Sequence, residues 1–352
     1  MNGVSASSHL VLSGAYSILP AGVDAGAAAG RLAAGRDYPR SPFEFHFWFP
    51  DDAACLAYLE RLRWPDGFRC PRCAAAGAKA WHLSAREVRC SVCRCETSVT
   101  AGTIFEATRL PLTTWFQAAW FVTNEKLGTS ALALQRAVCL SRYETAWMIL
   151  HKLRRAMVRP GRERLSGEVE VDETYVGGAV PGKQGRGALG KAIVAIAVEA
   201  QGLGERSQRV ASGRVRLARI RDCSELSLTA FCEEAIEAGS VAYTDHWSGY
   251  KGLGDAGFVH HPTNISVSGD PAHVAMPRVH RVASLLKRWL LGTHQGGISV
   301  RQLDFYLDEF VFRFNRRHSR SRGLLFYRLL EQAVQVNPVP AREIVGGRLY
   351  IP

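Results

Sequence analysis

The sequence has no apolar run long enough to cross a membrane. A spanning helix needs about 18 or more continuous apolar residues, and the 352-residue chain contains no such run. It also has no lysine or arginine before Arg31, so the basic start of a secretory signal is missing. We therefore expect a cytoplasmic protein that has no membrane partner.

Acidic residues are in the minority. The chain has 32 Asp and Glu against 44 Lys and Arg, which gives a formal net charge of +12 and an isoelectric point near 9.5. Such an excess favours a polyanionic partner such as nucleic acid or a membrane surface. With 47% hydrophobic residues, the chain can form two or three small domains, so a disordered protein is excluded.

Cysteines are few, and their distribution argues against a disulfide framework. There are nine, an odd number, and five of them lie within residues 70–95. Cys70 and Cys73 form one CxxC pair, and Cys90 and Cys93 form a second after sixteen intervening residues. Two such pairs can close a tetrahedral, structural zinc site. Free thiols or a redox CxxC are the alternative, and Cys95 could compete with Cys93 as the fourth ligand. The other four are expected to be small core residues: Cys55, Cys139, Cys223 and Cys232.

The two ends of the chain are predicted to be tails. Residues 1–41 are rich in Ala, Gly and Ser without a sustained period, and residues 336–352 form a C-terminal tail. Aromatic residues become dense from Phe43, and Asp51 and Asp52 can cap an amphipathic helix over residues 53–63. We assign residues 43–108 to a zinc ribbon region.

Residues 110–160 are predicted to form three helices, at 112–126, 130–138 and 142–158. Thr113 and Thr114 are expected to cap the first, and Ser141 with Glu144 forms a capping box for the third. The tight turn before the third helix resembles a helix-turn-helix that binds DNA. An ordinary three-helix unit with a solvated basic face is the alternative. The basic residues on the third helix and directly after it are Arg142, Lys152, Arg154, Arg155 and Arg159.

Residues 168–175 alternate acidic and apolar side chains. This period of two predicts a strand with Val169 and Val171 on one face and Glu170, Asp172 and Thr174 on the other. Carboxylates are rarely buried unless they are paired or bind a cation, so the acidic face indicates a divalent metal. A solvated face of an antiparallel sheet is the alternative.

The following residues predict a mixed sheet. A Gly-rich basic turn at 177–187 leads to strands at 192–200 and 213–220, then a helix at 225–238 and a short strand at 240–244 that ends on Asp245. A right-handed crossover should make the last strand parallel to a strand of the preceding meander. Asp245 would then lie at the carboxyl end of a strand, where open α/β sheets place their sites.

Asp172 and Asp245 are the residues on which we expect the chemistry to depend. Two converging carboxylates can hold two divalent ions for in-line attack on a phosphodiester. A basic helix at 279–291 begins thirty-four residues after Asp245. On it His280, Ser284 and Lys287 share one face, so that a ligand and a phosphate-binding lysine could reach the same site.

Several motifs of the sequence together resemble those of one protein family. Besides the two cysteine pairs, the motifs are TSVTAGTIF at 97–105, EVDETYVGG at 170–178, YTDH at 243–246, LKRWLLGTH at 286–294 and YLDEFVFRFNRR at 306–317. Together they are similar to insertion-sequence transposases of the ISXO-like group, which join a zinc ribbon to a DDE-type, RNase H-like catalytic domain. The resemblance implies an α+β multidomain chain with its catalytic domain at residues 165–335.

The resemblance also implies roles for single residues. Asp172 and Asp245 correspond to the first two catalytic acids, position 280 to the third, and Lys287 to the lysine seven residues further on. The chain departs from the three-acid pattern because residue 280 is a histidine. An imidazole is neutral near pH 7, so we expect the site to bind Mg²⁺ weakly and Mn²⁺ better. A structural histidine that bonds a nearby carbonyl is the alternative for His280.

The expected function is transposition of an insertion sequence, by metal-dependent strand cleavage and strand transfer. The alternative is a DNA-binding descendant that has lost catalysis. Partners are then double-stranded DNA, at element ends and target, and further copies of the chain, at the nucleoid. Asp308 and Glu309 lie on a helix at 300–316 whose apolar stripe favours packing over catalysis. Further phosphate contacts are expected from Arg288, Arg313, Arg316 and Arg317.

Overall fold

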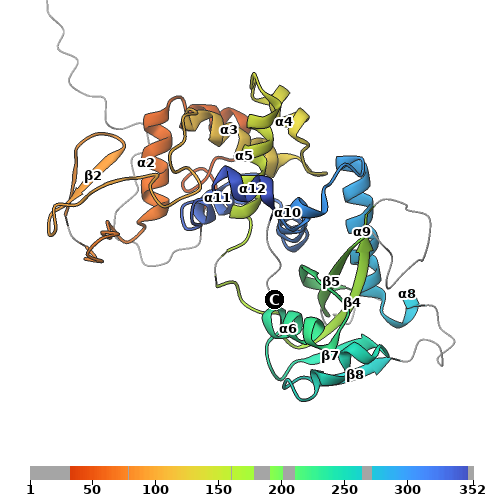
Figure 1. Ribbon diagram of the computed structural model, residues 1–352. Helices are drawn as coiled ribbons and strands as arrows, with labels where there is room; N and C mark the ends of the chain where they lie inside the picture. The colour runs from red at the N-terminus through yellow and green to blue at the C-terminus, as the bar shows by residue number, and fades with distance from the viewer. Residues whose placement is uncertain are drawn as a thin grey trace, which may run out of the picture.

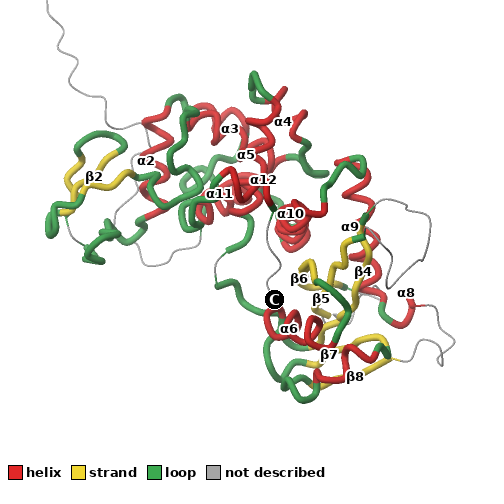
Figure 2. Tube along the Cα trace, in the orientation of Figure 1, coloured by secondary structure: helices red, strands yellow, loops and turns green. Residues whose placement is uncertain are grey.

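The computed structural model describes residues 32–77, 79–159, 161–177, 191–200, 211–263 and 272–347. Most of the predicted N-terminal tail, most of the Gly-rich turn and the last residues of the predicted C-terminal tail lie outside these ranges. Figure 1 shows two main parts, and in Figure 2 the helices gather in one of them and the larger sheet in the other. Within the described residues no helix has the length and apolar content needed to cross a bilayer.

The helical part comprises six helices around one apolar core. They are α1 (Pro42–Trp48), α2 (Asp52–Arg63), α3 (Leu112–Asn124), α4 (Ala131–Ala137), α5 (Tyr143–Ala156) and α11 (Arg322–Ala333). The Asp51 carboxylate accepts from the N–H of Ala54 and begins α2, and the Ser130 hydroxyl begins α4 in the same way. These two predicted starts are confirmed to within a residue.

Two predicted caps are wrong. Pro111 precedes α3, and the Thr113 N–H and hydroxyl both donate to Asp52 of α2 at 3.0 and 3.2 Å. Thr113 is therefore already inside the helix. Asp52 of the neighbouring helix α2 accepts the hydrogen bond of an N–H group in the first turn of α3. Arg142, in extended conformation and without a side-chain bond, precedes α5. Ser141 lies one residue too early to serve as the N-cap.

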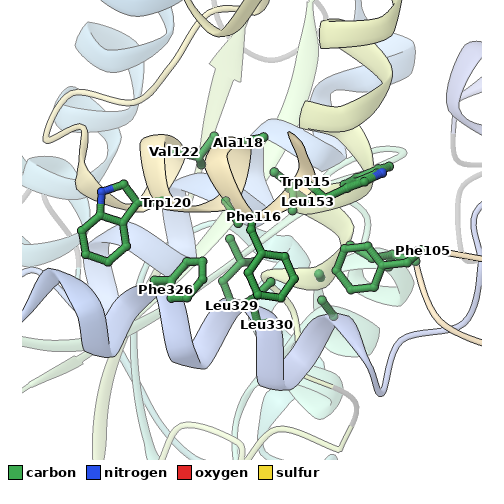
Figure 3. Packing of buried hydrophobic residues seen from close by; sticks show 14 of the residues in the cluster. Phe105, Trp115, Phe116, Ala118, Trp120, Val122, Leu153, Phe326, Leu329 and Leu330 are labelled. Carbon is green, nitrogen blue, oxygen red and sulfur yellow. The ribbon is translucent and has the colours of Figure 1, made fainter. Parts of the chain in front are cut away.

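Helix α11 belongs to the helical core and not to the sheet. Its Phe326, Leu329 and Leu330 are fully buried against α3. Figure 3 shows Phe116 of α3 pointing toward Phe326, and the two ring centroids are 5.8 Å apart at 69°. Helix α11, which the predicted catalytic domain at 165–335 includes, thus packs its apolar face on α3 and the helical core.

The described end of the predicted N-terminal tail is packed. Tyr38 is only 6% exposed and lies 6.3 Å from the ring of Tyr327 on α11. The Tyr58 hydroxyl donates to the carbonyl of Asp37 at 2.8 Å. A Cβ on Gly323 would lie 1.8 Å from the carbonyl oxygen of Pro39, so only glycine permits this approach. The tail prediction is wrong for this stretch, since its aromatic ring finds an apolar surface on α11.

The predicted ribbon is a small antiparallel sheet of three strands in sequence order. They are β1 (Ala80–His82), β2 (Glu87–Cys90) and β3 (Glu96–Ser98). Its apolar core contains only Phe68, Cys70, Val88 and Cys90 as buried members. So small a core cannot stabilise a sheet by itself, which is consistent with stabilisation by a metal.

The larger sheet has five strands in the order β6-β5-β4-β7-β8. They are β4 (Glu168–Val176), β5 (Ala192–Ala200), β6 (Ser212–Ile220), β7 (Val241–Asp245) and β8 (Val259–Thr263). Strands β4, β5 and β6 form the predicted antiparallel meander, and the crossover helix α6 (Glu225–Ala235) makes β7 parallel to β4. The predicted mixed α/β, RNase H-like architecture is confirmed.

Helices cover both faces of this sheet. Val169 and Val171 pack with α6 on one face. On the other face, β5 and β6 pack with α9 (Pro277–His294) and α10 (Leu303–Asn315), and α9 runs beside β4 and β5 in Figure 1. The remaining short elements are η1 (Ser248–Leu253), α8 (Ala272–Ala275), η2 (Val300–Gln302) and α12 (Ala341–Gly346). The acidic face of β4 therefore lies on the side of α9.

A buried ionic centre on α10 joins the two parts. The Glu309 carboxylate has no exposed surface and accepts from Arg154 of α5 and Arg313 of α10, each at 2.8 Å. Arg154 is itself 1% exposed, and its guanidinium lies 4.1 Å from the ring centroid of Tyr306. These contacts place two cations and one anion in the interior, and they confirm that Glu309 has a packing role.

We predict that Glu309→Ala strongly destabilises the protein. Removal of one partner leaves buried charges without compensation, which costs roughly 3–5 kcal/mol. Urea denaturation measures the loss. Glu331→Ala is the matched control, because its pair with Arg328 is partly exposed and such pairs contribute about 1 kcal/mol or less. Equal losses in the two variants would contradict the assignment.

His151 of α5 is buried beside this centre and stays neutral. In the described structure neither ring nitrogen has a hydrogen-bond partner, and three aromatic rings surround it, those of Trp147, Phe305 and Tyr306. Burial, with a smaller effect of Arg154, lowers the pKa of His151 from 6.5 to about 2. Burial also lowers the pKa of His294 to about 4.

We predict that acid destabilises the protein through these histidines. Below pH 6.5 His151 becomes protonated in the unfolded chain but stays neutral in the folded protein. The contribution of this histidine to the free energy of unfolding is therefore fully present above pH 6.5. It then falls by about 1.4 kcal/mol per pH unit for each such group. His151→Phe fits the same aromatic surroundings and should reduce this slope between pH 6 and about 4.5. An unchanged slope of unfolding free energy against pH would show that His151 does not contribute.

Candidate active site

The acidic strand β4 divides its side chains between the two faces of the sheet. Val169 and Val171 are fully buried in the core that contains α6. Glu170 contacts the start of α9 on the opposite face, and Asp172 follows two residues later on that face. The predicted alternation is therefore confirmed, and the alternative of a solvated outer face is not.

Strand register supports the pairing of Asp172 with Asp245. In the parallel pairing of β4 with β7, Glu168 lies opposite Val241 and Glu170 opposite Tyr243. The same register, continued by two residues beyond the last paired position, would set Asp172 beside Asp245. Neighbouring strands lie about 4.8 Å apart, so the two carboxylates would then share one edge of the site. The pair itself stays a prediction.

Backbone amides orient both carboxylates. Oδ1 of Asp172 accepts from the N–H of Glu173 at 2.8 Å. Oδ1 of Asp245 accepts from the N–H of Trp247 at 3.1 Å, in the turn that follows β7.

His280 of α9 approaches the same site. Its Nε2 lies 3.9 Å from Oδ2 of Asp172, and the side chains of His280 and Asp172 are 31% and 18% exposed. The helix and the strand therefore place an imidazole beside the first carboxylate. This proximity agrees with the predicted place of residue 280, while its role as a ligand stays a prediction.

Glu170 fixes the start of α9, a role that the sequence analysis missed. Its Oε2 accepts from the N–H groups of Arg278 and Val279 at 2.8 and 2.9 Å, and its Oε1 pairs with the Arg278 guanidinium at 2.7 Å. Met276 precedes α9 and offers no side-chain cap. A helix that starts without a capping side chain needs an acceptor from elsewhere in the chain for its first N–H groups. The absence of a capping residue before α9 was the feature of the sequence that could have indicated this role of Glu170.

Lys287 lies further along α9. Seven residues at 1.5 Å each place it about 10 Å beyond His280. Its side chain is exposed. No hydrogen bond or ion pair joins it to another residue of the described structure, so it is available to an external phosphate. Ser284, between the two, is also exposed.

The donor set suits a hard divalent cation, but its ligand atoms are not yet converged. Two carboxylates with one imidazole are a chemically suitable set for Mg²⁺ or Mn²⁺. Across the described residues, however, the four ribbon cysteines are the group of three or more ligand residues whose atoms all lie within 4.8 Å of one another. Asp172, Asp245 and His280 are the residues that would hold such a cation.

The two CxxC pairs form a second, separate site. Cys70 and Cys93 approach to 3.6 Å between sulfurs, and Cys73 and Cys90 to 3.8 Å. The two pairs have the same backbone turn. The N–H of Ala74 donates to the carbonyl oxygen of Cys70, the N–H of Arg94 donates to the carbonyl oxygen of Cys90, and both donors have φ near +60°. Four sulfurs in this arrangement match a closed, structural zinc site.

Cys95 lies outside this cluster. Its sulfur donates to the carbonyl of Glu96 at 3.5 Å, and its own carbonyl accepts from the N–H of Cys90. The backbone of Cys95 thus supports the second knuckle, and the sulfur is not among the clustered ligands. Cys55 and Cys232 are buried as predicted. Cys139 is exposed and Cys223 half-buried, so for these two the core prediction is wrong.

Arg154 does not reach a surface phosphate, so that part of the DNA-binding prediction is wrong. Its guanidinium is held by Glu309, by the Thr129 carbonyl and by the Tyr306 ring. The reason is position, because Arg154 lies on the buried stripe of α5 with Leu150 and Leu153. Arg155, the next residue, is half-exposed.

The other predicted DNA contacts differ in exposure. Arg142 and Arg288 are exposed, and Lys152 is half-buried over Trp115. Three arginines at the end of α10 carry structural bonds to backbone carbonyls: Arg313 to Val122 and Glu125, Arg316 to Phe312, and Arg317 to Ser212 and Gly213. Of these three only Arg317 is exposed, so they join segments as well as carrying charge.

Two family models match the chain. The model of the ISXO2-like transposase domain matches residues 164–315, and that of the transposase zinc-ribbon domain matches residues 50–96. Among curated proteins, the chain is similar to an uncharacterised protein in transposable element ISH50 of Halobacterium salinarum. The two are 29% identical over 290 residues, which cover 75% of this chain and 91% of the relative. The matched ranges contain the four cysteines and the three residues of the candidate site.

We predict that Cys70→Ser removes the metal and unfolds the ribbon. Loss of one of four thiolates opens a closed site in a unit with almost no apolar core. The wild-type chain should contain one zinc per chain by elemental analysis, and the variant should lose it and become sensitive to protease within residues 68–98. Cys95→Ser is the control and should keep its zinc. Freshly purified wild type with clearly less than one zinc per chain would refute the site.

Proposed function

Because the chain belongs to the insertion-sequence transposases that join a zinc ribbon to an ISXO2-like transposase domain, we propose that it cleaves DNA at the ends of such an element and joins them to target DNA. The observation that supports this most directly is the site itself. Asp172 and Asp245 lie on neighbouring parallel strands whose register, continued by two residues, would pair them, and His280 lies 3.9 Å from Asp172.

The proposed reaction is a pair of in-line displacements at phosphorus. In the first, a water oxygen bonds to the phosphorus at the element end, the bond to the 3′-oxygen breaks, and that oxygen leaves with a proton as a 3′-hydroxyl. In the second, this hydroxyl attacks a phosphodiester of the target and releases the 3′-oxygen of the target strand. Bound divalent ions supply activation of the attacking oxygen and stabilisation of the leaving oxygen.

The residues of this chain have separate tasks in that scheme. Asp172 and Asp245 would hold the cations, with one oxygen of each carboxylate oriented by a backbone amide. His280 provides the third ligand or positions a water. Lys287, exposed on the same helix, binds a phosphate of the DNA that lies along α9. Glu170 keeps the first turn of α9, and therefore His280, at a fixed place.

The metal preference follows from charge. With a neutral imidazole at position 280 the site carries two negative charges where a three-acid site carries three. It should therefore hold Mg²⁺ less tightly. An imidazole is a softer ligand than a carboxylate, so Mn²⁺ is the better cofactor by comparison.

Assembly follows from the substrate. An element has two ends, and each end needs an active site when it is joined to the target. One chain has one such site, so we propose that at least two copies act together on DNA. The zinc ribbon and the exposed basic residues of the helical part, including Arg142, contribute binding to the element ends. The action is expected at the nucleoid in the cytoplasm, where the substrate is found.

The histidine at position 280 also motivates a second hypothesis. A descendant that binds DNA without cutting it would keep the ribbon and the helical part, and a changed third ligand is the kind of difference that such a protein could carry. The neighbouring Asp172, Asp245 and Lys287 would have no reason to remain together in it. The same cleavage assay separates the two hypotheses.

We predict that both Asp172→Asn and His280→Ala impair strand transfer, but with different metal dependence. Asp172→Asn should abolish transfer of a labelled element end with either metal. His280→Ala should lower the rate at least about 100-fold in Mg²⁺, as expected for the loss of a metal contact, and less in Mn²⁺. His280→Glu should recover activity in Mg²⁺.

The control for these variants is His318→Ala, an exposed histidine after α10 that should retain wild-type rates. Full activity of His280→Ala in both metals, with loss in Asp172→Asn, would make His280 structural. Wild-type protein that binds the element end but never cuts it would instead favour the non-catalytic hypothesis.

A further inference from the structure

A cleft of about 310 Å³ lies where the helical part meets the edge strand of the large sheet. The end of α5 and the linker after it form one wall, β6 a second, and the ends of α10 and α11 the rest. Its charge is dominated by six arginines, which are Arg159, Arg162, Arg214, Arg216, Arg316 and Arg328. It is separate from the candidate active site, since none of Asp172, Asp245 and His280 lines it.

Half of these arginines have a carboxylate partner. Arg159 pairs with Glu163 at 2.6 Å, Arg214 with Glu199 at 2.6 Å, and Arg328 with Glu331 at 2.7 Å. Arg162, Arg216 and Arg316 have no carboxylate within ion-pair distance among the residues described. The cleft therefore has an excess of positive charge that the protein itself does not neutralise.

Two of the unneutralised guanidiniums are largely removed from water. Arg216 is 6% exposed, and it donates only to the carbonyls of Val215 and Glu163. Arg316 stacks at 4.1 Å on the ring of Phe312. Burial lowers the pKa of both arginines to about 10. A buried cation without an anion is costly, so the arrangement is suited to an anion that comes from outside.

The side chains that line the cleft favour a phosphate group over a whole nucleotide. Guanidinium groups match phosphate oxygens with two parallel hydrogen bonds. Asn315 holds the wall rigid, since its side chain both accepts from and donates to the backbone of Val215. Among the described lining residues Phe312 is the one aromatic ring, and Arg316 covers it, so no ring face is left for a base to stack on.

The position of the cleft relates it to the active site. Leu217 of β6 pairs with Ile196 of β5, which pairs with Asp172 of β4. Leu217 is therefore level with Asp172 and on the same face, whereas Arg216, the next residue, directs its side chain to the opposite face at the sheet edge, two strands or about 10 Å from Asp172 along the sheet. That separation equals about three base pairs of duplex DNA at about 3.4 Å each.

We propose that this cleft binds a backbone phosphate of the DNA whose end reacts at Asp172 and Asp245. The proposal rests on the proposed function, because it assumes that the bound DNA is the substrate. The bound phosphate would fix the duplex at the junction of the two parts, a few base pairs from the reacting bond. Arg162, Arg216 and Arg316 are then positioning residues and not catalytic ones.

The test compares two neighbouring arginines of the linker in the full-length chain. Arg162→Gln removes a cation from the cleft. Arg164→Gln removes the same charge from the same segment at a side chain that does not line it. Binding to an element-end duplex is measured by fluorescence anisotropy over a range of NaCl concentrations. Arg162→Gln should reduce the slope of log affinity against log salt by about 0.9, the value for one phosphate, and Arg164→Gln should reduce it clearly less.

A second variant guards against a folding artefact. Arg216→Lys keeps the charge but loses the bidentate hydrogen-bonding geometry of the guanidinium. The variant should fold, which thermal denaturation checks, and it should bind the duplex several-fold more weakly. Equal slopes for Arg162→Gln and Arg164→Gln would overturn the proposal. So would a rise of the melting temperature with inorganic phosphate that Arg162→Gln abolishes without any change in DNA binding, since the cleft would then serve a free anion. Wild type that binds no duplex would refute the proposed function itself.

Discussion

The Glu309 carboxylate is the interaction on which the arrangement of the two parts depends. It holds Arg154, which also donates to the Thr129 carbonyl before α4, and Arg313, which donates to carbonyls at the end of α3. One anion thereby connects α3, α4 and α5 with α10. The desolvation of these charges offsets much of their attraction, so the net contribution of the centre to stability is smaller than the cost of removing one partner alone.

The same junction reaches the candidate active site through α9. Trp289 and Thr293 of α9 both donate to the carbonyl of Leu127, in the loop before α4. A Cβ on Gly128 would lie 2.7 Å from the Trp289 indole nitrogen, and Gly128 has φ near +87°, so this loop requires glycine. The helix that carries His280 is thus anchored at one end to the helical part and at the other to Glu170 of the sheet. Rotation of one part would move His280 relative to Asp172.

Local patterns predicted four of the five strands described in the large sheet, because the information for these four is local, and β8 was not predicted. The alternation in β4, the apolar run of β5 and the crossover through α6 follow from periodicity and from the handedness of strand connections. The position of His280 is different, since nothing in its own helix requires it to approach Asp172. Its assignment came from a resemblance to a family, and the 3.9 Å contact agrees with it.

Arg154 shows why long-range partners escape sequence analysis. A cation in a basic helix was assigned to the surface, yet Arg154 follows Leu150 by four residues and Leu153 by one, and so lies on the buried stripe of α5. That pattern was visible in the sequence. Its partner Glu309 lies 155 residues away on another helix, and no local pattern pairs them. The same limit applies to α11, whose apolar face could have covered either the sheet or α3.

Glu170 and Asp172 lie on the same face of β4 and yet have different tasks. This difference determines which carboxylates could act together with His280. Glu170 uses both oxygens to hold the first turn of α9, so it is not available to a cation. Asp172 and Asp245 then remain as the candidate carboxylate ligands among the residues described for this site, and a backbone amide orients one oxygen of each. Under the proposed function, the residue at position 280 of α9 would add the third ligand. A change there from a carboxylate to an imidazole would alter the charge of the site and its choice of metal, and it would leave the two aspartates of the sheet in place.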